Sequence, residues 1–284
     1  MQLLNTEISL IEWSQQHWYK VVFDGATHWC ASVTTKIGGT LHKEGLDRWR
    51  GDIGNREADM RMNEASNRGK RIHAAYETFL KGGTVIYDPW EHSQYTEEQI
   101  AEIKKQNKFF FALRNQDEMY DLYKLQRQFQ ILRPRVLAVE ARVFDLENRD
   151  AGTIDNVLEI EGGSYAVSGS KPLVLEPGIY INDLKTGSFL DDNVWLQLAP
   201  YAKMYEAISG LSVKGALVTH TGAKTRSGIR GLTTLFRDRE TLFGSDYSDY
   251  RHASSLWERK HKDEQPETFT FPNLIKIQQE QTFE

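Results

Sequence analysis

The sequence predicts an α/β protein with a mixed central β-sheet flanked by helices, an N-terminal helical region and an inserted β-ribbon. Two observations lead to this prediction. Apolar residues recur with helical spacing between residues 55 and 80, and helical segments recur between 96 and 132. Strand-like runs follow at residues 135–144, 151–160 and 178–187, an order that favours a sheet packed against helices. A chain of 284 residues is long enough to bury a sizeable core.

The N-terminal part begins with extended segments at residues 18–25 and 28–37. Helical periodicity starts near Leu41 and resumes from about residue 55 to 80. Gly82 and Gly83 then stop the helix. The apolar residues that fall near one face of this helix are Ala58, Met62, Ala65, Ile72, Ala75 and Phe79.

A second helical region begins with "TEEQ" at residues 96–99, which has the pattern of a capping box. We expect this region in two pieces, ended by Pro134. After the strand-like runs, the patterns predict an amphipathic helix from about 191 to 208, a strand at 213–221 and a last helix near 246–262.

The chain shows no internal repeat and no convincing interdomain linker, so we expect one domain over residues 1–284. Its parts are a mainly helical region at 1–134, a catalytic core at 135–222, and a basic loop, helix and tail at 223–284. A polar, glycine-rich segment within the core predicts a ribbon insertion at about 159–178.

Composition excludes several classes of protein. The single cysteine, Cys30, excludes an internal disulfide and any zinc site or cluster built on several thiolates. No stretch approaches the ~20 apolar residues of a membrane span, and the first residues lack a signal or transit pattern. These features predict a cytoplasmic protein with no membrane partner. The net charge of −5 argues against a surface that coats nucleic acid throughout, but leaves room for a local basic groove.

Basic residues gather in two places. Those between Arg48 and Arg71 alternate with acids, so a solvated helix face and a functional surface are equally open. The run "KTRSGIRG" combines glycines with Lys224, Arg226 and Arg230, which indicates a loop or hairpin that could follow a phosphate backbone.

The run "GIYINDLKTGSF", residues 178–189, ends a strand in an aspartate and a lysine. Because side chains alternate along a strand, Asp183 and Lys185 share one face and Leu184 points to the other. Taken alone, this pair is an ion pair at an edge strand without chemistry. Three other residues favour a functional site.

Asp155 ends the neighbouring run "AGTID", so two carboxylates converge from adjacent strands. Such a pair is a hard oxygen site suited to Mg²⁺ or Mn²⁺. Glu140 is a carboxylate in a largely apolar run, and it is either a surface position or a neighbour of the two aspartates. His73 lies on the first long helix, where a histidine is more often structural than a ligand.

Together these motifs resemble the PD-(D/E)xK nuclease core in its RecB-like branch. The resemblance rests on a helix histidine, G-x-x-D, D-x-K-T and Q-x-x-x-Y, which occur here in that order. The residues that carry it are His73, Glu140, Gly152-Thr153-Ile154-Asp155, Asp183-Leu184-Lys185-Thr186 and Gln197-Leu198-Ala199-Pro200-Tyr201. The stretches "SVTT" and "RGKRIH" are also similar to phage-type and mitochondrial genome-maintenance exonucleases. The resemblance spans roughly residues 30–210. Two departures are the long segment between Asp155 and Asp183 and the absence of the cysteines that hold an iron–sulfur cluster in several relatives.

The resemblance implies a restriction-endonuclease-like core and a role for each residue. Asp155, Asp183, the Leu184 carbonyl and His73 would hold one or two Mg²⁺ or Mn²⁺ ions, with no iron–sulfur cluster. Lys185 would hold the attacking water and stabilise the scissile phosphate. Glu140 would support the metal from outside or bind a second one. Gln197 and Tyr201, on one helical face, would grip phosphate or orient Lys185; a polar surface strip and a packing role are the alternatives.

Ser32, Thr34 and Arg68 would contact DNA phosphates by the same resemblance, although Ser32 and Thr34 equally suit a helix cap. Aromatic and basic residues also interleave between 109 and 129, which suits either a stacking platform for single strands or a simple core face.

The sequence therefore predicts a metal-dependent DNA exonuclease, encoded by a phage or bacterium and acting in recombination, replication or repair. Its partners would be DNA ends and a recombination or single-strand-binding protein. The alternatives are a structure-specific or restriction-like endonuclease on the same core, and a non-catalytic DNA-binding module. A chance occurrence of the motifs in an unrelated α/β protein is the remaining possibility.

Overall fold

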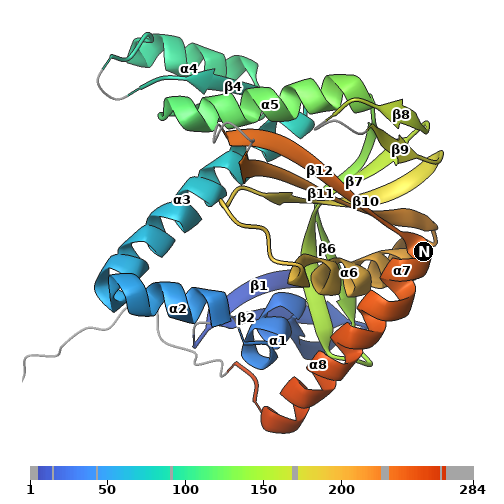
Figure 1. Cartoon of the computed structure of the whole chain (residues 1–284). Coiled ribbons are helices and arrows are strands. Elements are labelled where there is room, and N and C mark those ends of the chain that lie inside the picture. Colours follow the sequence, from blue (N-terminus) through green and yellow to red (C-terminus); the bar gives the residue numbers. More distant parts are fainter. Residues whose placement is uncertain are drawn as a thin grey trace, which may run out of the picture.

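The computed structural model describes residues 6–14, 16–42, 44–89, 92–167, 172–224, 230–262 and 264–266. It is a mixed α/β structure in which helices cover both faces of a central sheet (Figure 1). The predicted fold class is confirmed. The strands of the central sheet run in the order β1-β2-β3-β7-β10-β11-β12, and β6 pairs with the other edge of β7.

The central sheet contains antiparallel and parallel pairs. β3 and β7 are parallel, as are β10 and β11, whereas the remaining pairs are antiparallel. Its strands are β1 (Glu7–Trp13), β2 (Gln16–Phe23), β3 (Ala26–Ser32), β6 (Arg135–Asp145), β7 (Asp150–Ile160), β10 (Gly178–Lys185), β11 (Val213–Lys224) and β12 (Arg230–Asp238).

Two helix layers enclose this sheet. On one side, α3 (Asn55–Leu80) and α5 (Gln116–Leu132) pack together, and Leu184 of β10 joins their core. On the other side, α1 (Val33–Thr40) and α6 (Asn193–Ser209) pack against the sheet through a core that contains Ile181. The short helix α7 (Arg239–Thr241), the π-helix η1 (Leu242–Asp246) and α8 (Tyr247–Lys260) complete that side.

A small lobe projects from the α5 side (Figure 1). It consists of β4 (Thr84–Tyr87), α4 (Glu97–Gln106) and β5 (Phe110–Leu113), and its two strands are parallel. The predicted capping box is present at the start of α4, where Thr96 and Gln99 exchange hydrogen bonds. The helix α2 (Glu44–Ile53) immediately precedes the N-terminal end of α3.

The expected ribbon insertion is a two-stranded antiparallel hairpin of β8 (Gly163–Tyr165) and β9 (Leu173–Leu175). It covers Leu158 and Tyr180 on the α5 side of the sheet. The predicted bounds of α3, α6 and α8 differ from the observed ones by no more than two residues.

Two local predictions were wrong. The segment 28–37, expected to be extended throughout, turns into α1 at Val33, because the Ser32 hydroxyl caps the helix by accepting from the Thr35 N–H at 2.9 Å. The first part of the chain also contains β4 and β5, which are only four residues each and too short for an alternating pattern to stand out. No helix in the described part of the chain is long and apolar enough to cross a membrane.

Candidate functional site

The site lies where the strands beside β7 separate. The start of β7 pairs with the end of β3, through Ser32↔Ala151, and its second half pairs with β10 from Asn156 onward. Residues 152–155 lie between these two pairings, at a fork in the sheet. We call this place the fork.

Acidic residues from three strands meet at the fork. The register of β6 on β7 sets Glu140 opposite Asp155. The pairing of β10 with β7 ends at Asn182↔Asn156, so Asp183 is the first residue of β10 beyond it. Strands that are distant in sequence thus bring Glu140 and Asp155 together, and Asp183 lies close enough for its charge to raise the pKa of Asp155.

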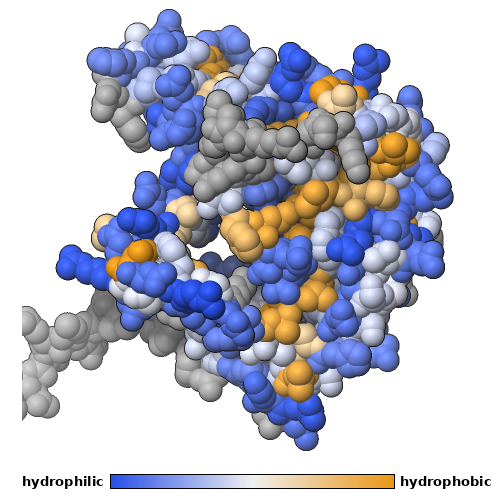
Figure 2. All heavy atoms as spheres, viewed as in Figure 1, coloured by the Kyte–Doolittle hydropathy of each residue, from blue (hydrophilic) through white to orange (hydrophobic). Residues whose placement is uncertain are grey.

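His73 reaches the same place from α3. One ligand atom each from His73, Glu140 and Asp155 lies within 4.8 Å of the other two, and His73 Nδ1 is 3.6 Å from Asp155 Oδ2. A cavity of about 470 Å³ opens beside them, and Figure 2 shows the molecule hollowed between the arm of α2 and α3 and the body. The cavity is lined by Ser66, Gly69, Lys70, His73, Ala74, Glu77, Glu140 and Asp155.

Glu140 has an unusual backbone. Its φ is +52°, a left-handed conformation that costs a non-glycine residue about 1–2 kcal/mol. The alternation of side chains between the two faces of β7 is also interrupted opposite Glu140. Ile154 and Val157 are three residues apart and would face opposite sides of a regular strand, but both pack in the same core cluster. Although much of the side chain reaches solvent, partial desolvation of the carboxyl and the negative charge of Asp155 raise the pKa of Glu140 to about 7.

Asp155 is held by the backbone of β10. The Leu184 N–H donates to Asp155 Oδ2 at 2.7 Å, so the carboxylate replaces the backbone carbonyl that would accept this hydrogen bond if the pairing with β7 continued. Burial and the charge of Asp183 raise the pKa of Asp155. The Leu184 side chain packs with α3 and α5, on the face opposite Ile181, which confirms the predicted alternation of this strand.

Asp183, Lys185 and Gln197 form a connected group beside the fork. Lys185 Nζ lies 2.8 Å from Asp183 Oδ2 and 3.0 Å from Oδ1. Gln197 Nε2 donates to Asp183 Oδ1 at 3.2 Å, and Gln197 Oε1 accepts from Lys185 at 3.4 Å. Gln197 thus makes the contact that orienting Lys185, one of its alternatives, requires. Asp183, which we expected among the metal ligands, contacts these two side chains and is not part of the His73, Glu140 and Asp155 group.

Lys185 is a cation in this arrangement. Burial lowers the pKa of its ammonium, but the charges of Asp183 and Asp155 outweigh burial, and the pKa is raised overall. Lys185 consequently offers donors and positive charge at neutral pH. A role as proton acceptor would require a nearby cation to lower that pKa.

Tyr201 is buried and packs on Gly152 of β7, where a Cβ would overlap the tyrosine ring. Glycine at position 152 thus lets α6 approach the fork closely enough for Gln197 to reach Asp183. The geometry favours the packing alternative for Tyr201, whereas Gln197 contacts Asp183 and Lys185 and is not part of a surface strip.

The residues at the fork fit a divalent cation. Two carboxylates and one imidazole converge. Burial first, and neighbouring negative charge second, raise the pKa values of Glu140 and Asp155, and a bound cation would compensate that charge. Oxygen-rich sets with one imidazole suit Mn²⁺ and Mg²⁺. Asp183 and the Leu184 carbonyl stay predicted ligands.

Two of the residues expected to contact DNA, Ser32 and Arg68, form contacts within the protein. Ser32 is buried as the α1 cap and its hydroxyl lies 2.8 Å from that of Thr34, so the capping alternative holds for Ser32. Arg68 forms an ion pair with the buried Asp121 and donates to the Thr186 carbonyl at 3.3 Å. Arg68 therefore anchors the residue that follows Lys185.

The expected basic loop lies partly outside the described residues. Arg226 falls in the segment 225–229, and the side chains of Lys224 and Arg230 are likewise outside the description, so their DNA contacts stay predictions. The backbones of Lys224 and Arg230 pair with one another at the ends of β11 and β12, as a hairpin requires.

Sequence reasoning missed three residues around the site. Lys70 and Glu77 line the cavity, and their spacing of three and four residues from His73 on α3 was the available signal. His220 Nε2 lies 2.7 Å from the Gly187 carbonyl oxygen and so fixes the chain just after Lys185. His220 had no local signal, because only the pairing of β11 with β10 brings it there.

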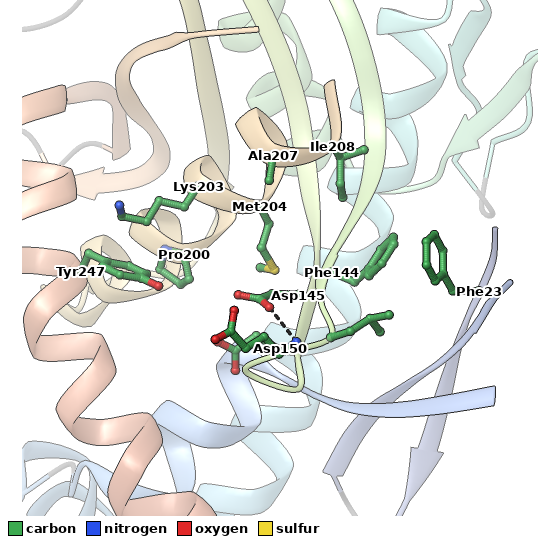
Figure 3. Close-up of a pocket in the computed structure, with 12 residues that line it drawn as sticks. Phe23, Phe144, Asp145, Asp150, Pro200, Lys203, Met204, Ala207, Ile208 and Tyr247 are labelled. Carbon is green, nitrogen blue, oxygen red and sulfur yellow. Dashed lines mark hydrogen bonds between the residues drawn. The ribbon is translucent and has the colours of Figure 1, made fainter. Parts of the chain in front are cut away.

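A second hollow lies away from the fork. This cavity of about 510 Å³ is lined by none of the predicted site residues, and in Figure 3 Asp145 and Asp150 point into it beside Met204. Both carboxylates are engaged: Asp150 lies 2.6 Å from Lys36 Nζ, and Asp145 accepts the Glu147 N–H at 3.0 Å. We therefore place the candidate chemistry at the fork.

No protein-family model matches the chain, and no curated protein matches it significantly.

Proposed function

We propose that this protein hydrolyses phosphodiester bonds in DNA with a divalent metal ion, as an exonuclease of the PD-(D/E)xK type. The observation that supports this most is the convergence of His73, Glu140 and Asp155 at the fork, beside the linked Asp183 and Lys185. Motifs that are far apart in the sequence resemble that nuclease core. His73, Glu140 and Asp155 line one cavity, and Lys185 and Gln197 line a second one.

His73, Glu140 and Asp155 would hold the cation, which when bound would neutralise phosphate charge and favour attack by water. Lys185 would donate hydrogen bonds to the attacking water and to a non-bridging phosphate oxygen. Gln197 would hold Lys185 in place through its side-chain oxygen. Arg68 and His220 would keep Thr186 and Gly187 fixed, so that Lys185 does not swing away.

The test is digestion of end-labelled linear DNA with Mg²⁺ or Mn²⁺. The wild type should release nucleotides from ends, whereas Asp155→Asn and Lys185→Gln should each reduce the rate at least about a hundredfold. Asp192→Asn is the matched control, because Asp192 is exposed and its side chain forms no cap on α6. Digestion that is absent under every metal and strand condition would refute the proposal.

An endonuclease on the same core is the second candidate, because the same residues would serve either reaction. Closed circular DNA separates the two. An exonuclease leaves the circle intact, and a restriction-like enzyme cuts it. A protein that binds DNA but cuts neither substrate would be the non-catalytic module.

A further inference from the structure

A cluster of lysines on phenylalanine rings lies where the lobe meets α3. Lys81 and Lys108 place their ammonium groups 5.5 and 5.4 Å from the centre of the Phe109 ring. Lys104 lies 5.6 Å from the centre of the Phe110 ring. These distances are within the range of cation–π attraction. We call these five residues the lysine–phenylalanine cluster.

The cluster draws on separate segments of the chain. Lys81 caps the end of α3, Lys104 lies in the last turn of α4, and Lys108 precedes β5. All three lysines are exposed. A favourable position at the negative end of a helix explains a lysine in the last turn of α4, but it does not explain Lys108, which lies outside that helix. The aromatic rings instead bring lysines from three segments next to two adjacent residues of the chain.

Through Lys81, the cluster follows the face of α3 that lines the cavity at the fork. Lys70, His73 and Glu77 line the cavity at intervals of three and four residues, and Lys81 follows after four more. Lys81 is thus about 12 Å beyond His73 along the helix axis. In Figure 1, α3 runs from α2 past the sheet to the lobe.

The acidic side chains near the cluster do not cancel its positive charge. Glu77 pairs with Lys81, and Glu102 accepts a hydrogen bond from Gln106 at 2.8 Å. Lys104 and Lys108 keep exposed ammonium groups, and Lys105 adds a further exposed cation next to them. Exposed ammonium groups held in fixed positions suit the regularly spaced charges of a nucleic-acid backbone.

We propose that the lysine–phenylalanine cluster binds the phosphate backbone of a nucleic-acid strand that extends from the fork along α3. This inference rests on the proposed function for the identity of the ligand. The cluster is too far from the fork to touch the scissile phosphate. It lies a few nucleotides away, at about 3.4 Å per nucleotide of a strand, and so contributes to affinity for long strands.

The experiment replaces Lys81, Lys104 and Lys108 together by glutamine. The matched control replaces Lys214, Lys260 and Lys262, which are also exposed and lie on β11, at the end of α8 and just beyond it. Binding of a fluorescent single strand of about 30 nucleotides, long enough to reach from the fork to the cluster, is measured by anisotropy. Ca²⁺ replaces Mg²⁺, and the salt concentration is varied.

The cluster variant should bind at least about tenfold more weakly. Its plot of log K against log salt should be less steep by about 2, since each lost contact to a single strand removes about 0.7. Hydrolysis of thymidine p-nitrophenyl phosphate, which is too short to reach the cluster, should be unchanged. An unchanged slope, or an equal change in the control variant, would overturn the proposal.

Failure of this inference is distinguishable from failure of the proposed function. If the wild type hydrolyses no phosphodiester but the cluster variant alone loses affinity, binding by the cluster is supported and the nuclease function is refuted. If hydrolysis proceeds and both variants bind DNA equally well, the nuclease function is supported and binding by the cluster is refuted.

Discussion

Glu140 adopts a left-handed backbone conformation within β6 and holds its carboxylate beside His73 and Asp155. The sequence placed this glutamate in an apolar run and left its role open. Only the register of β6 on β7 sets it opposite Asp155. A strained backbone at a cluster of charged groups is typical of functional sites, where surrounding structure enforces it.

Ionisation of Glu140 should destabilise the metal-free protein. Its folded-state pKa of about 7 is higher than the ordinary 4.5, so the folded state favours the protonated form. This contribution to stability is complete below pH ~4.5 and is lost as the pH rises through ~7. Glu140→Gln should therefore gain stability relative to wild type at pH ~8 but not at pH ~4.5. Urea unfolding in EDTA at the two pH values measures the difference.

Glu176→Gln is the matched control, because Glu176 is highly exposed and lies after β9, away from the fork. Added Mn²⁺ should stabilise the wild type at pH ~8 more than Glu140→Gln, since binding to the folded state shifts the equilibrium. Equal pH dependence of wild type and Glu140→Gln would contradict the assigned pKa.

At the scale of elements, the contact between β7 and α6 positions the site. Alternation along β10 was predictable, because the side-chain period of a strand is a local property. The approach of α6 was not, because it depends on Tyr201 packing onto a glycine nearly fifty residues earlier in the chain. The G-x-x-D motif includes Gly152, but it does not indicate that the glycine is needed to make room for the Tyr201 ring.

Gly152→Ala should destabilise the protein by about 1–3 kcal/mol, because its Cβ would overlap the Tyr201 ring. Tyr201→Ala should cost about 3–5 kcal/mol by itself, and the double variant should cost less than the sum, since the small side chain makes room for the new methyl. Chemical denaturation gives all three values. Additive losses would show that the two residues are not in conflict.

Gly51→Ala is the control for this cycle. Position 51 lies in α2, and a methyl group added there would meet no heavy atom within 4 Å. Alanine there should be neutral or stabilising, because glycine is the weaker helix former.

At the scale of the whole molecule, a buried lysine joins α1 to β7 and to the C-terminal helix α8. Lys36 of α1 is fully buried, and its Nζ lies 2.6 Å from Asp150 at the start of β7 and 2.5 Å from Glu258 of α8. The ammonium also lies 5.6 Å from the centre of the Trp257 ring. These contacts tie the first and last described helices to the strand that forms the fork.

Lys36→Met should destabilise the protein by about 3–5 kcal/mol, because it leaves the buried Asp150 without its main partner. The double variant Lys36→Met/Asp150→Asn should recover part of this loss, since the uncompensated charge is removed. Thermal and urea unfolding provide the measurement. Lys214→Met, at a side chain that is 47% exposed, is the control and should change little. A mild loss in Lys36→Met would mean that the ion pair stabilises little.

The sequence by itself determined the class of fold, the extent of α3 and α6, and the shared face of Asp183 and Lys185. Each of these depends on spacing within a few residues, which the sequence states directly. Tertiary structure alone decided that Glu140 rather than Asp183 groups with His73 and Asp155, and that Lys36 is buried. Those outcomes depend on strand register and on helix packing between segments far apart in the chain, and no local pattern records either.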